Sequence, residues 1–433
     1  MGKVKCRRTA WFGAAAVCVI FGISLVTSLP FAIACQNTAL SPDALLYQDI
    51  ATNLLLGRGF VQEVRSDDIV VPPLFPVLVA GVYYVFGHGN ILAVLLVQCF
   101  LNGATACLVF LIGRELFNRW VGVLGALLYA SYPIAAFFTA CVLTETLFTF
   151  LVAVFAYGLV RLSRDVVRWS DALITGLAWG LGCLTRPHLL LFGPVLAAVV
   201  LLVRRGRSIK YAVVSTAIGL LIIMPWISYT YVSRGFFIPL ASHGQHALWQ
   251  GNSEFSNPRE YYDALRVMAD PTYNATLEYV RTLPAKEQGT FYLQEAIEYI
   301  TSDPGRFVEN TCLKALQLWK PVQLYAVADQ RAFPTVPVPV LRSLVTVSDR
   351  ALCWLLVPGL LLALSWGIRR HQLLFWILVY FTVTVSLGII DYYGRYRLPI
   401  MPLAAIYGGV SLYVGSVFIA HLFVRVRRRL RKR

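Results

Sequence analysis

The segment Ser41–Phe60, SPDALLYQDIATNLLLGRGF, decides how the rest of the chain is interpreted. It follows an apolar run over residues 10–35, which is long enough for the ~20 helical residues that cross a bilayer. Ser41 and Pro42 are typical of a helix start, and Asp43 would lie in the first turn, where the helix dipole favours a carboxylate. The segment therefore predicts a short amphipathic helix just outside a first membrane span.

The composition of the whole chain indicates a polytopic membrane protein. Of its 433 residues, 58% are hydrophobic and 14% are charged, and the mean hydropathy is +0.65. A chain of this kind buries most of its surface in lipid rather than in a water-soluble core. Apolar runs predict an all-α membrane fold of about 10 transmembrane helices. The predicted spans cover residues 10–35, 90–113, 119–136, 142–162, 171–185, 187–203, 211–231, 350–368, 371–390 and 398–424.

Basic residues are concentrated in the loops on one predicted side of the membrane. These loops hold more than half of the 38 lysines and arginines, including those of the C-terminal segment RVRRRLRKR. Since lysine and arginine are retained on the cytoplasmic side, both termini are predicted to be cytoplasmic. The net charge of +16 therefore reflects topology and contact with membrane lipids, and it predicts no nucleic-acid-binding face.

The span positions divide the chain into three predicted parts. Residues 1–231 form an N-terminal membrane module of seven spans, with a first outer loop over residues 36–90. Within that loop the run PPLFPVLVAGVYYVFG, residues 72–87, is short for a span and rich in proline, so we expect a juxtamembrane helix. Residues 232–349 form an outer helical domain, and residues 350–433 form a C-terminal module of three spans with the basic tail.

Charged residues from distant parts of the sequence fall at the outer ends of the predicted spans. They are Asp43, Glu145 in VLTETLF, Arg186 in LTRPHLL, and Arg395 with Arg397 in DYYGRYRLP. Taken singly, the arginines are ordinary interfacial residues and Asp43 is an ordinary helix-start acid. Glu145 is less ordinary, because a carboxylate at the edge of an apolar span is costly unless it is paired. Their convergence on one membrane face predicts a shared functional site.

The ordered set of motifs resembles the GT-C superfamily of membrane glycosyltransferases, in particular its protein O-mannosyltransferase and lipid A aminoarabinose transferase group. The first outer loop reads D-x-x-x-Y from Asp43 to Tyr47 and then A-x-x-L-x-x-G-x-G-F over residues 51–60. The motifs PPLFP, LTE, LTRPHLLLF and RYRLPIMP follow, with ALWQGN and EAIEYITSDPGRF in the outer domain. No single motif is specific, but the set extends over nearly the whole chain.

The resemblance implies a hexosyl- or pentosyltransferase that moves a sugar from a polyprenyl-phosphate carrier to a lipid, glycan or protein acceptor on the non-cytoplasmic face. It also implies a bacterial inner-membrane location with a periplasmic active site. Because the leaving group is a phosphate, one carboxylate suffices as base, and one-step displacement predicts inversion. The implied site residues are Asp43 as base, Arg186, Arg395 and Arg397 as donor-phosphate ligands, and Tyr47, Glu145 and His188 as positioning residues.

The segment before the proline pair departs from this family pattern. Several relatives carry a second acid and a lysine or histidine there, whereas this chain has Val70 and Val71, with Asp67 and Asp68 slightly upstream. A hard divalent cation prefers clustered carboxylate oxygens, and no such cluster can be aligned. The sequence therefore assigns no metal-ligating residue and no firm cofactor. A divalent metal stays open, as do the roles of Asp67, Asp68 and Asp49.

Other classes of protein remain compatible with the sequence. The nearest alternative is an oligosaccharide ligase or polymerase that uses pyrophosphate-linked donors. A lipid-linked sugar flippase or a transporter would also place charges in spans, but such proteins break their helices near the bilayer midplane, whereas the charges here lie at the outer edge. A non-enzymatic assembly protein that binds partners through the outer domain would not need Asp43.

Overall fold

The computed structural model describes residues 2–37, 41–63, 70–193, 209–256, 269–320, 338–366, 369–388 and 393–430, and these residues form helices, turns and loops without a strand. The α-helices are α1 (Gly2–Cys35), α2 (Pro42–Leu55), α3 (Leu74–Phe86), α4 (Ile91–Leu116), α5 (Arg119–Ala130), α6 (Pro133–Phe138), α7 (Glu145–Leu162), α8 (Trp169–Cys183), α10 (Ile209–Arg234), α11 (His243–Gly251), α13 (Pro271–Thr282), α14 (Ala285–Ser302), α15 (Pro304–Leu318), α16 (Val338–Ser365), α17 (Gln372–Gly388), α18 (Tyr393–Arg397) and α19 (Met401–Leu430). Short 3-10 turns occur at η1 (Pro187–Leu189), η2 (Arg369–His371) and η3 (Leu398–Ile400). The all-α prediction is confirmed for the described residues.

Six helices in the described part of the chain are long and apolar enough to cross a membrane. They lie within Phe12–Cys35, Ile91–Leu116, Glu145–Leu162, Ile209–Arg234, Ser343–Ser365 and Arg395–Arg425, and three shorter apolar helices are Leu74–Phe86, Arg119–Ala130 and Gln372–Gly388. The chain is thus an integral membrane protein, and the count of about 10 spans stays a prediction. The predicted span over residues 187–203 lies partly outside the described residues.

The predicted span over residues 119–136 is not one helix. Helix α5 ends at Ala130, and α6 begins at Pro133 after a break at Tyr132. Proline lacks a backbone N–H and is tolerated in the first turn of a helix, so Pro133 starts a new helix rather than continuing α5. The predicted juxtamembrane run, by contrast, does form a helix, α3.

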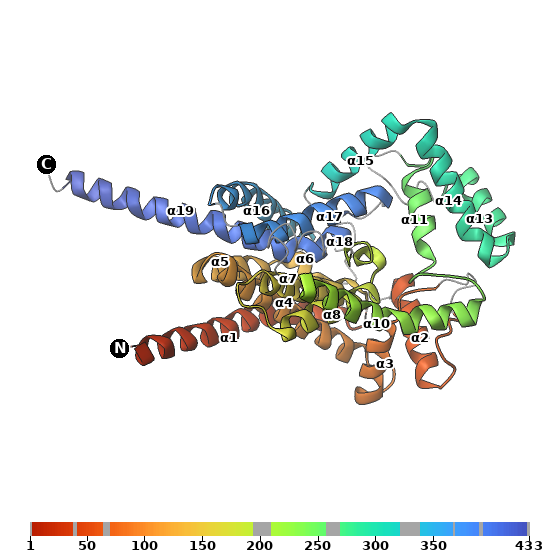
Figure 1. Cartoon of the computed structure of the whole chain (residues 1–433), viewed down its shortest axis with the longest axis horizontal. Coiled ribbons are helices and arrows are strands. Elements are labelled where there is room, and N and C mark those ends of the chain that lie inside the picture. The colour runs from red at the N-terminus through yellow and green to blue at the C-terminus, as the bar shows by residue number, and fades with distance from the viewer. Residues whose placement is uncertain are drawn as a thin grey trace.

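The helices are arranged so that the two ends of the molecule differ (Figure 1). Helices α1 and α19 extend to the same end, where both chain termini lie, while α11, α13, α14 and α15 lie together at the opposite end. Helices α2 and α3 also lie toward that second end. Helix α2, which carries Asp43, therefore lies away from the chain termini.

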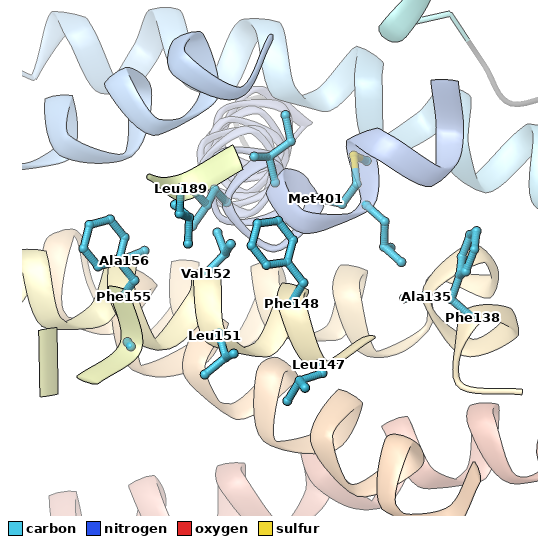
Figure 2. Close-up of a cluster of buried hydrophobic side chains, with 14 of the residues drawn as sticks. Ala135, Phe138, Leu147, Phe148, Leu151, Val152, Phe155, Ala156, Leu189 and Met401 are labelled. Atoms are coloured by element: carbon cyan, nitrogen blue, oxygen red, sulfur yellow. The ribbon is translucent and has the colours of Figure 1, made fainter. Parts of the chain in front are cut away.

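Helix α7 lies at the centre of the apolar core. Its residues Leu147, Phe148, Leu151, Val152, Phe155 and Ala156 pack among Ala135 and Phe138 of α6, Leu189 of η1 and Met401 of α19 (Figure 2). Membrane helices pack through close contacts rather than through exclusion of water, so small residues matter where helices cross. A Cβ atom on Gly125 of α5 would lie 2.8 Å from the Ala405 carbonyl oxygen of α19, so this crossing needs a glycine.

The first outer loop folds back onto α2. Gly57 and Gly59 have φ angles of 72° and 86°, a conformation that other residues rarely adopt, and they turn the chain after α2. The Asp49 carboxylate then accepts hydrogen bonds from the Asn53 side chain at 3.3 Å and from the Glu63 backbone N–H at 2.5 Å. Asp49 therefore fixes the return of the loop.

Candidate functional site

Asp43 lies in the first turn of α2, and its carboxylate is the more exposed of the two acids in the site. The Ser41 side chain caps this helix by accepting a hydrogen bond from the Ala44 N–H at 3.3 Å, and Pro42 occupies the first turn, as the sequence predicted. The Asp43 side chain is 39% exposed, and its Oδ2 atom lies 3.2 Å from a terminal nitrogen of Arg395. Asp43 is therefore paired but still accessible.

Glu145 begins α7 and is completely buried. Its Oε1 atom accepts a hydrogen bond from a terminal nitrogen of Arg186 at 2.5 Å and another from the Nε atom of Arg395. Its Oε2 atom is buried and has no hydrogen-bond partner in the described part of the chain. The single carboxylate thus bridges two arginines that are more than 200 residues apart, and one of its oxygens remains free to accept a hydrogen bond.

Arg186 lies in the turn between α8 and η1, and its guanidinium is held on several sides. Its Nε atom donates to the Thr144 hydroxyl at 2.8 Å, next to the ion pair with Glu145. The rings of Phe148 and Tyr396 lie 5.9 Å and 5.8 Å from the guanidinium carbon, within the range of cation–π contacts. Thr144 and Tyr396 were not predicted, although both directly neighbour predicted residues in the LTE and RYR motifs.

These contacts join Asp43, Glu145, Arg186 and Arg395 into one four-charge cluster. Tyr47 lies one turn after Asp43, and its ring packs against Phe75 at 5.1 Å. Burial, together with the Asp43 carboxylate, raises the pKa of Tyr47 to about 12, so its phenol stays protonated and can donate a hydrogen bond. The sequence predicted that Asp43, Glu145, Arg186, Arg395 and Arg397 converge, and the first four of these lie together here. Their shared functional role stays a prediction.

His188 lies beside the four-charge cluster in sequence but has different contacts. Its backbone carbonyl accepts a hydrogen bond from the Tyr380 hydroxyl at 2.5 Å. Its Nδ1 atom is buried and has no hydrogen-bond partner within the described ranges. A positioning role for His188 remains a prediction.

Arg397 is not brought to the four-charge cluster, although its sequence neighbour Arg395 is. Its side chain is completely buried, and one terminal nitrogen contacts both carboxylate oxygens of Asp349 in α16 at 2.6 Å and 2.7 Å. The other terminal nitrogen donates to the carbonyls of Leu318 and Lys320 at 3.0 Å and 3.2 Å. Because its terminal nitrogens are committed to these groups, we do not retain Arg397 among the donor-phosphate ligands.

Asp349 was missed as a functional residue because the sequence placed it at the end of the outer loop. It lies inside α16 and is completely buried. A single acid next to a long apolar run was the available signal. Its partner Tyr132 donates to the Asp349 Oδ1 atom at 2.6 Å.

The described residues contain no group of three or more histidine, cysteine, aspartate or glutamate side chains that could hold a metal ion. Val70 and Val71, which precede the proline pair, are buried. Asp67 and Asp68 lie outside the described residues. The cluster described here is built from ion pairs between carboxylates and guanidinium groups.

Comparison with protein families gives a partial match. The family profile described as Dolichyl-phosphate-mannose-protein mannosyltransferase matches residues 70–229, a region that includes Glu145 and Arg186. Among curated protein sequences, none matches the chain. The sequence match thus covers part of the membrane module.

Solved structures show the fold over nearly the whole chain. The archaeal oligosaccharyltransferase AglB from Archaeoglobus fulgidus, in complex with an inhibitory peptide and a dolichol-phosphate, is similar with a TM-score of 0.58 and 15% identity, over 97% of this chain and 52% of that chain. The apo form of that oligosaccharyltransferase is similar with a TM-score of 0.56 and 14% identity, over 97% and 52% of the two chains. This chain therefore spans about half the length of these proteins.

ArnT from Cupriavidus metallidurans, bound to undecaprenyl phosphate, is a more distant match, with a TM-score of 0.46 and 14% identity over 93% of this chain and 78% of that chain. The match to the oligosaccharyltransferase and the mannosyltransferase profile agree with the ordered motifs in the sequence. The chain has the fold of this archaeal oligosaccharyltransferase.

Proposed function

We propose that this protein is a membrane glycosyltransferase that moves a sugar from a polyprenyl-phosphate carrier to a lipid, glycan or protein acceptor. The observation that carries the proposal is the four-charge cluster, in which two acids and two arginines from four distant segments meet. Paired guanidinium forks suit a phosphate, and an accessible carboxylate suits a hydroxyl proton. The proposed location is a bacterial inner membrane, with cytoplasmic termini and the cluster on the periplasmic side.

In the proposed reaction, the acceptor hydroxyl oxygen forms a bond to the anomeric carbon while the bond from that carbon to the carrier phosphate breaks. Asp43 takes the hydroxyl proton, and the departing phosphate keeps the bonding electron pair. Arg186 and Arg395 stabilise the charge that develops on the phosphate, so no second acid is needed. Attack from the face opposite the leaving group inverts the configuration of the anomeric carbon.

The charge balance of the four-charge cluster also suggests how the proposed base, Asp43, would be released from Arg395. In the resting state each guanidinium is neutralised by carboxylates. The pair between Asp43 and Arg395 is the most exposed of these contacts, and at 3.2 Å it is the longest. The guanidinium fork also matches a phosphate, so in the proposed mechanism the donor phosphate takes the place of Asp43 on Arg395 and releases the carboxylate for catalysis.

Glu145 and Tyr47 would position the other groups. Glu145 is buried and bridges both arginines, so it fixes the direction in which they face. Its free Oε2 atom can accept a hydrogen bond from a sugar hydroxyl. The Tyr47 phenol, protonated at neutral pH, can donate to the phosphate or to the sugar.

The test is incubation of the purified full-length protein, in lipid nanodiscs, with a panel of polyprenyl-phosphate sugars and a generic acceptor extract, with release of the free carrier as the measurement. Pyrophosphate-linked oligosaccharides are included as a separate arm. We expect carrier release with at least one monophosphate donor and its loss in Arg186→Ala. Release only from pyrophosphate-linked donors would replace the proposal by a ligase or polymerase, and no release from any donor would contradict it.

A further inference from the structure

The five-residue helix α18 carries two arginines with separate partners. Arg395 reaches the four-charge cluster and its side chain is 23% exposed, whereas Arg397 is completely buried. Successive residues of an α-helix are ~100° apart around the axis, so residues two apart project in nearly opposite directions. Helix α18 therefore presents one arginine to the candidate site and the other to the packing behind it.

The packing behind α18 brings together three separate elements. Arg397 binds Asp349 of α16 through one terminal nitrogen and the carbonyls of Leu318 and Lys320, at the end of α15, through the other. Tyr132, which precedes α6, donates to the same Asp349 carboxylate at 2.6 Å. These groups form what we call the Arg397 clamp.

The aromatic side chain at the end of α15 strengthens this junction. The Trp319 ring lies 5.7 Å from the guanidinium carbon of Arg397, and its Nε1 atom donates to the Thr382 hydroxyl of α17 at 3.2 Å. A helix of five residues has too few internal hydrogen bonds to hold its own position. The position of α18, and with it the base of the Arg395 side chain, is therefore set by the clamp.

We infer that Arg397 is a positioning residue that, held by Asp349, aims Arg395 at the donor phosphate. This inference rests on the proposed function of Arg395. It assigns to the buried arginine of the RYR motif a role that requires no contact with substrate. It also links the end of the outer helices, through α15, to the candidate site.

The test measures binding of sugar-free polyprenyl phosphate to the full-length protein in nanodiscs. Asp349→Asn leaves the Arg397 charge without its counter-ion, and we expect about tenfold weaker binding. In an Arg395→Ala background the same change should have no further effect, because the clamp acts through Arg395. If the losses of affinity from Asp349→Asn and Arg395→Ala multiply in the double variant, the two residues act independently and the inference is overturned.

A matched control separates positioning from general loss of stability. Asp171 of α8 is buried and pairs with Arg161 of α7 at 2.5 Å, and Asp171→Asn breaks this pair. We expect Asp171→Asn to lower the melting temperature but to leave binding of polyprenyl phosphate unchanged. Equal weakening of binding by the control would overturn the inference.

Two further measurements test the Arg397 clamp if Asp349→Asn fails to fold or if the parent protein binds no polyprenyl phosphate. Tyr132→Phe removes one hydrogen bond from the clamp, so it should weaken binding in the same direction by about fivefold or less. Amide exchange of the peptide that covers Tyr393–Arg397 needs no ligand, and it should accelerate in Tyr132→Phe but not in Asp171→Asn. Unchanged amide exchange in Tyr132→Phe would overturn the inference that the clamp positions α18. A parent protein that binds no polyprenyl phosphate would overturn only the proposed function.

Discussion

The two arginines of the RYR motif have the same chemistry and are separated by one residue, yet they have different surroundings. Arg395 shares the Glu145 carboxylate with Arg186, pairs with the accessible Asp43 and is partly exposed, while Arg397 is completely buried against Asp349 and two carbonyls. A buried pair with committed partners resists exchange, because either charge left alone in the interior is costly. A shared and accessible pair can exchange one carboxylate for a phosphate. The four-charge cluster of the candidate site is therefore accessible, whereas the Arg397 clamp behind it is buried.

The largest expected effect is a loss of stability when the buried Arg397 clamp is broken. Asp349→Asn removes the counter-ion of Arg397, and we expect about 3–5 kcal/mol of lost stability, as for other buried pairs broken on one side. Asp43→Asn should cost at most about 1 kcal/mol, because the Asp43 carboxylate is partly solvated. Thermal unfolding of both variants in the same nanodiscs provides the measurement. Equal shifts in melting temperature would remove the distinction between the two regions.

The next largest effect is a loss of turnover when the accessible four-charge cluster is changed. Asp43→Asn keeps the shape and the helix start but cannot take a proton near neutral pH, so sugar transfer should fall ~100-fold or more. Asp49→Asn, on the same helix, serves as the control, because Asp49 holds the loop and should cost a few-fold at most. Turnover of Asp43→Asn within a few-fold of the parent would show that Asp43 is only a helix-start acid.

A smaller effect is expected from a substitution that keeps the positive charge at position 186 but removes the planar guanidinium fork. Arg186→Lys retains a cation near Glu145 but loses the fork that reaches Thr144 and Glu145 together. We expect about tenfold weaker use of the donor, measured as kcat/KM for the donor, and a larger loss in Arg186→Ala. If Arg186→Ala has unchanged kcat/KM, Arg186 does not bind the donor.

The smallest effect concerns Thr144, the residue that orients the Arg186 guanidinium. Thr144→Val keeps the shape of the side chain and removes one hydrogen bond, which corresponds to about fivefold weaker donor binding. Thr149→Val is the control, because the Thr149 hydroxyl donates only to the Glu145 backbone carbonyl of its own helix. Titration with polyprenyl phosphate should distinguish the two variants, and identical affinities would exclude a role for Thr144.

The sequence predicted the helical fold and much of the candidate site for identifiable reasons. Charges at the outer ends of apolar runs are costly when unpaired, so Asp43, Glu145, Arg186 and Arg395 could be expected to meet. The break at Pro133 was missed because hydropathy alone continues through it. Hydropathy measures the length of an apolar run and does not register the loss of a backbone donor.

The placement of Arg397 could not be predicted from the sequence. Which face of a short helix points to a site depends on its rotation about its own axis, and α18 is too short to show a hydrophobic periodicity. Its partner Asp349 was taken as the last residue of the outer loop, because the apolar run that predicted the span begins at residue 350, whereas α16 begins at Val338. Only the tertiary arrangement reveals that these two charges are paired.

The most direct test of the account is an experimental structure of the full-length protein with polyprenyl phosphate bound. We predict that the phosphate oxygens lie about 2.7–3.2 Å from the guanidinium nitrogens of Arg186 and Arg395. Asp43 should have left Arg395, while the pair between Arg397 and Asp349 should be intact. A phosphate bound elsewhere, with Asp43 still on Arg395, would contradict the account.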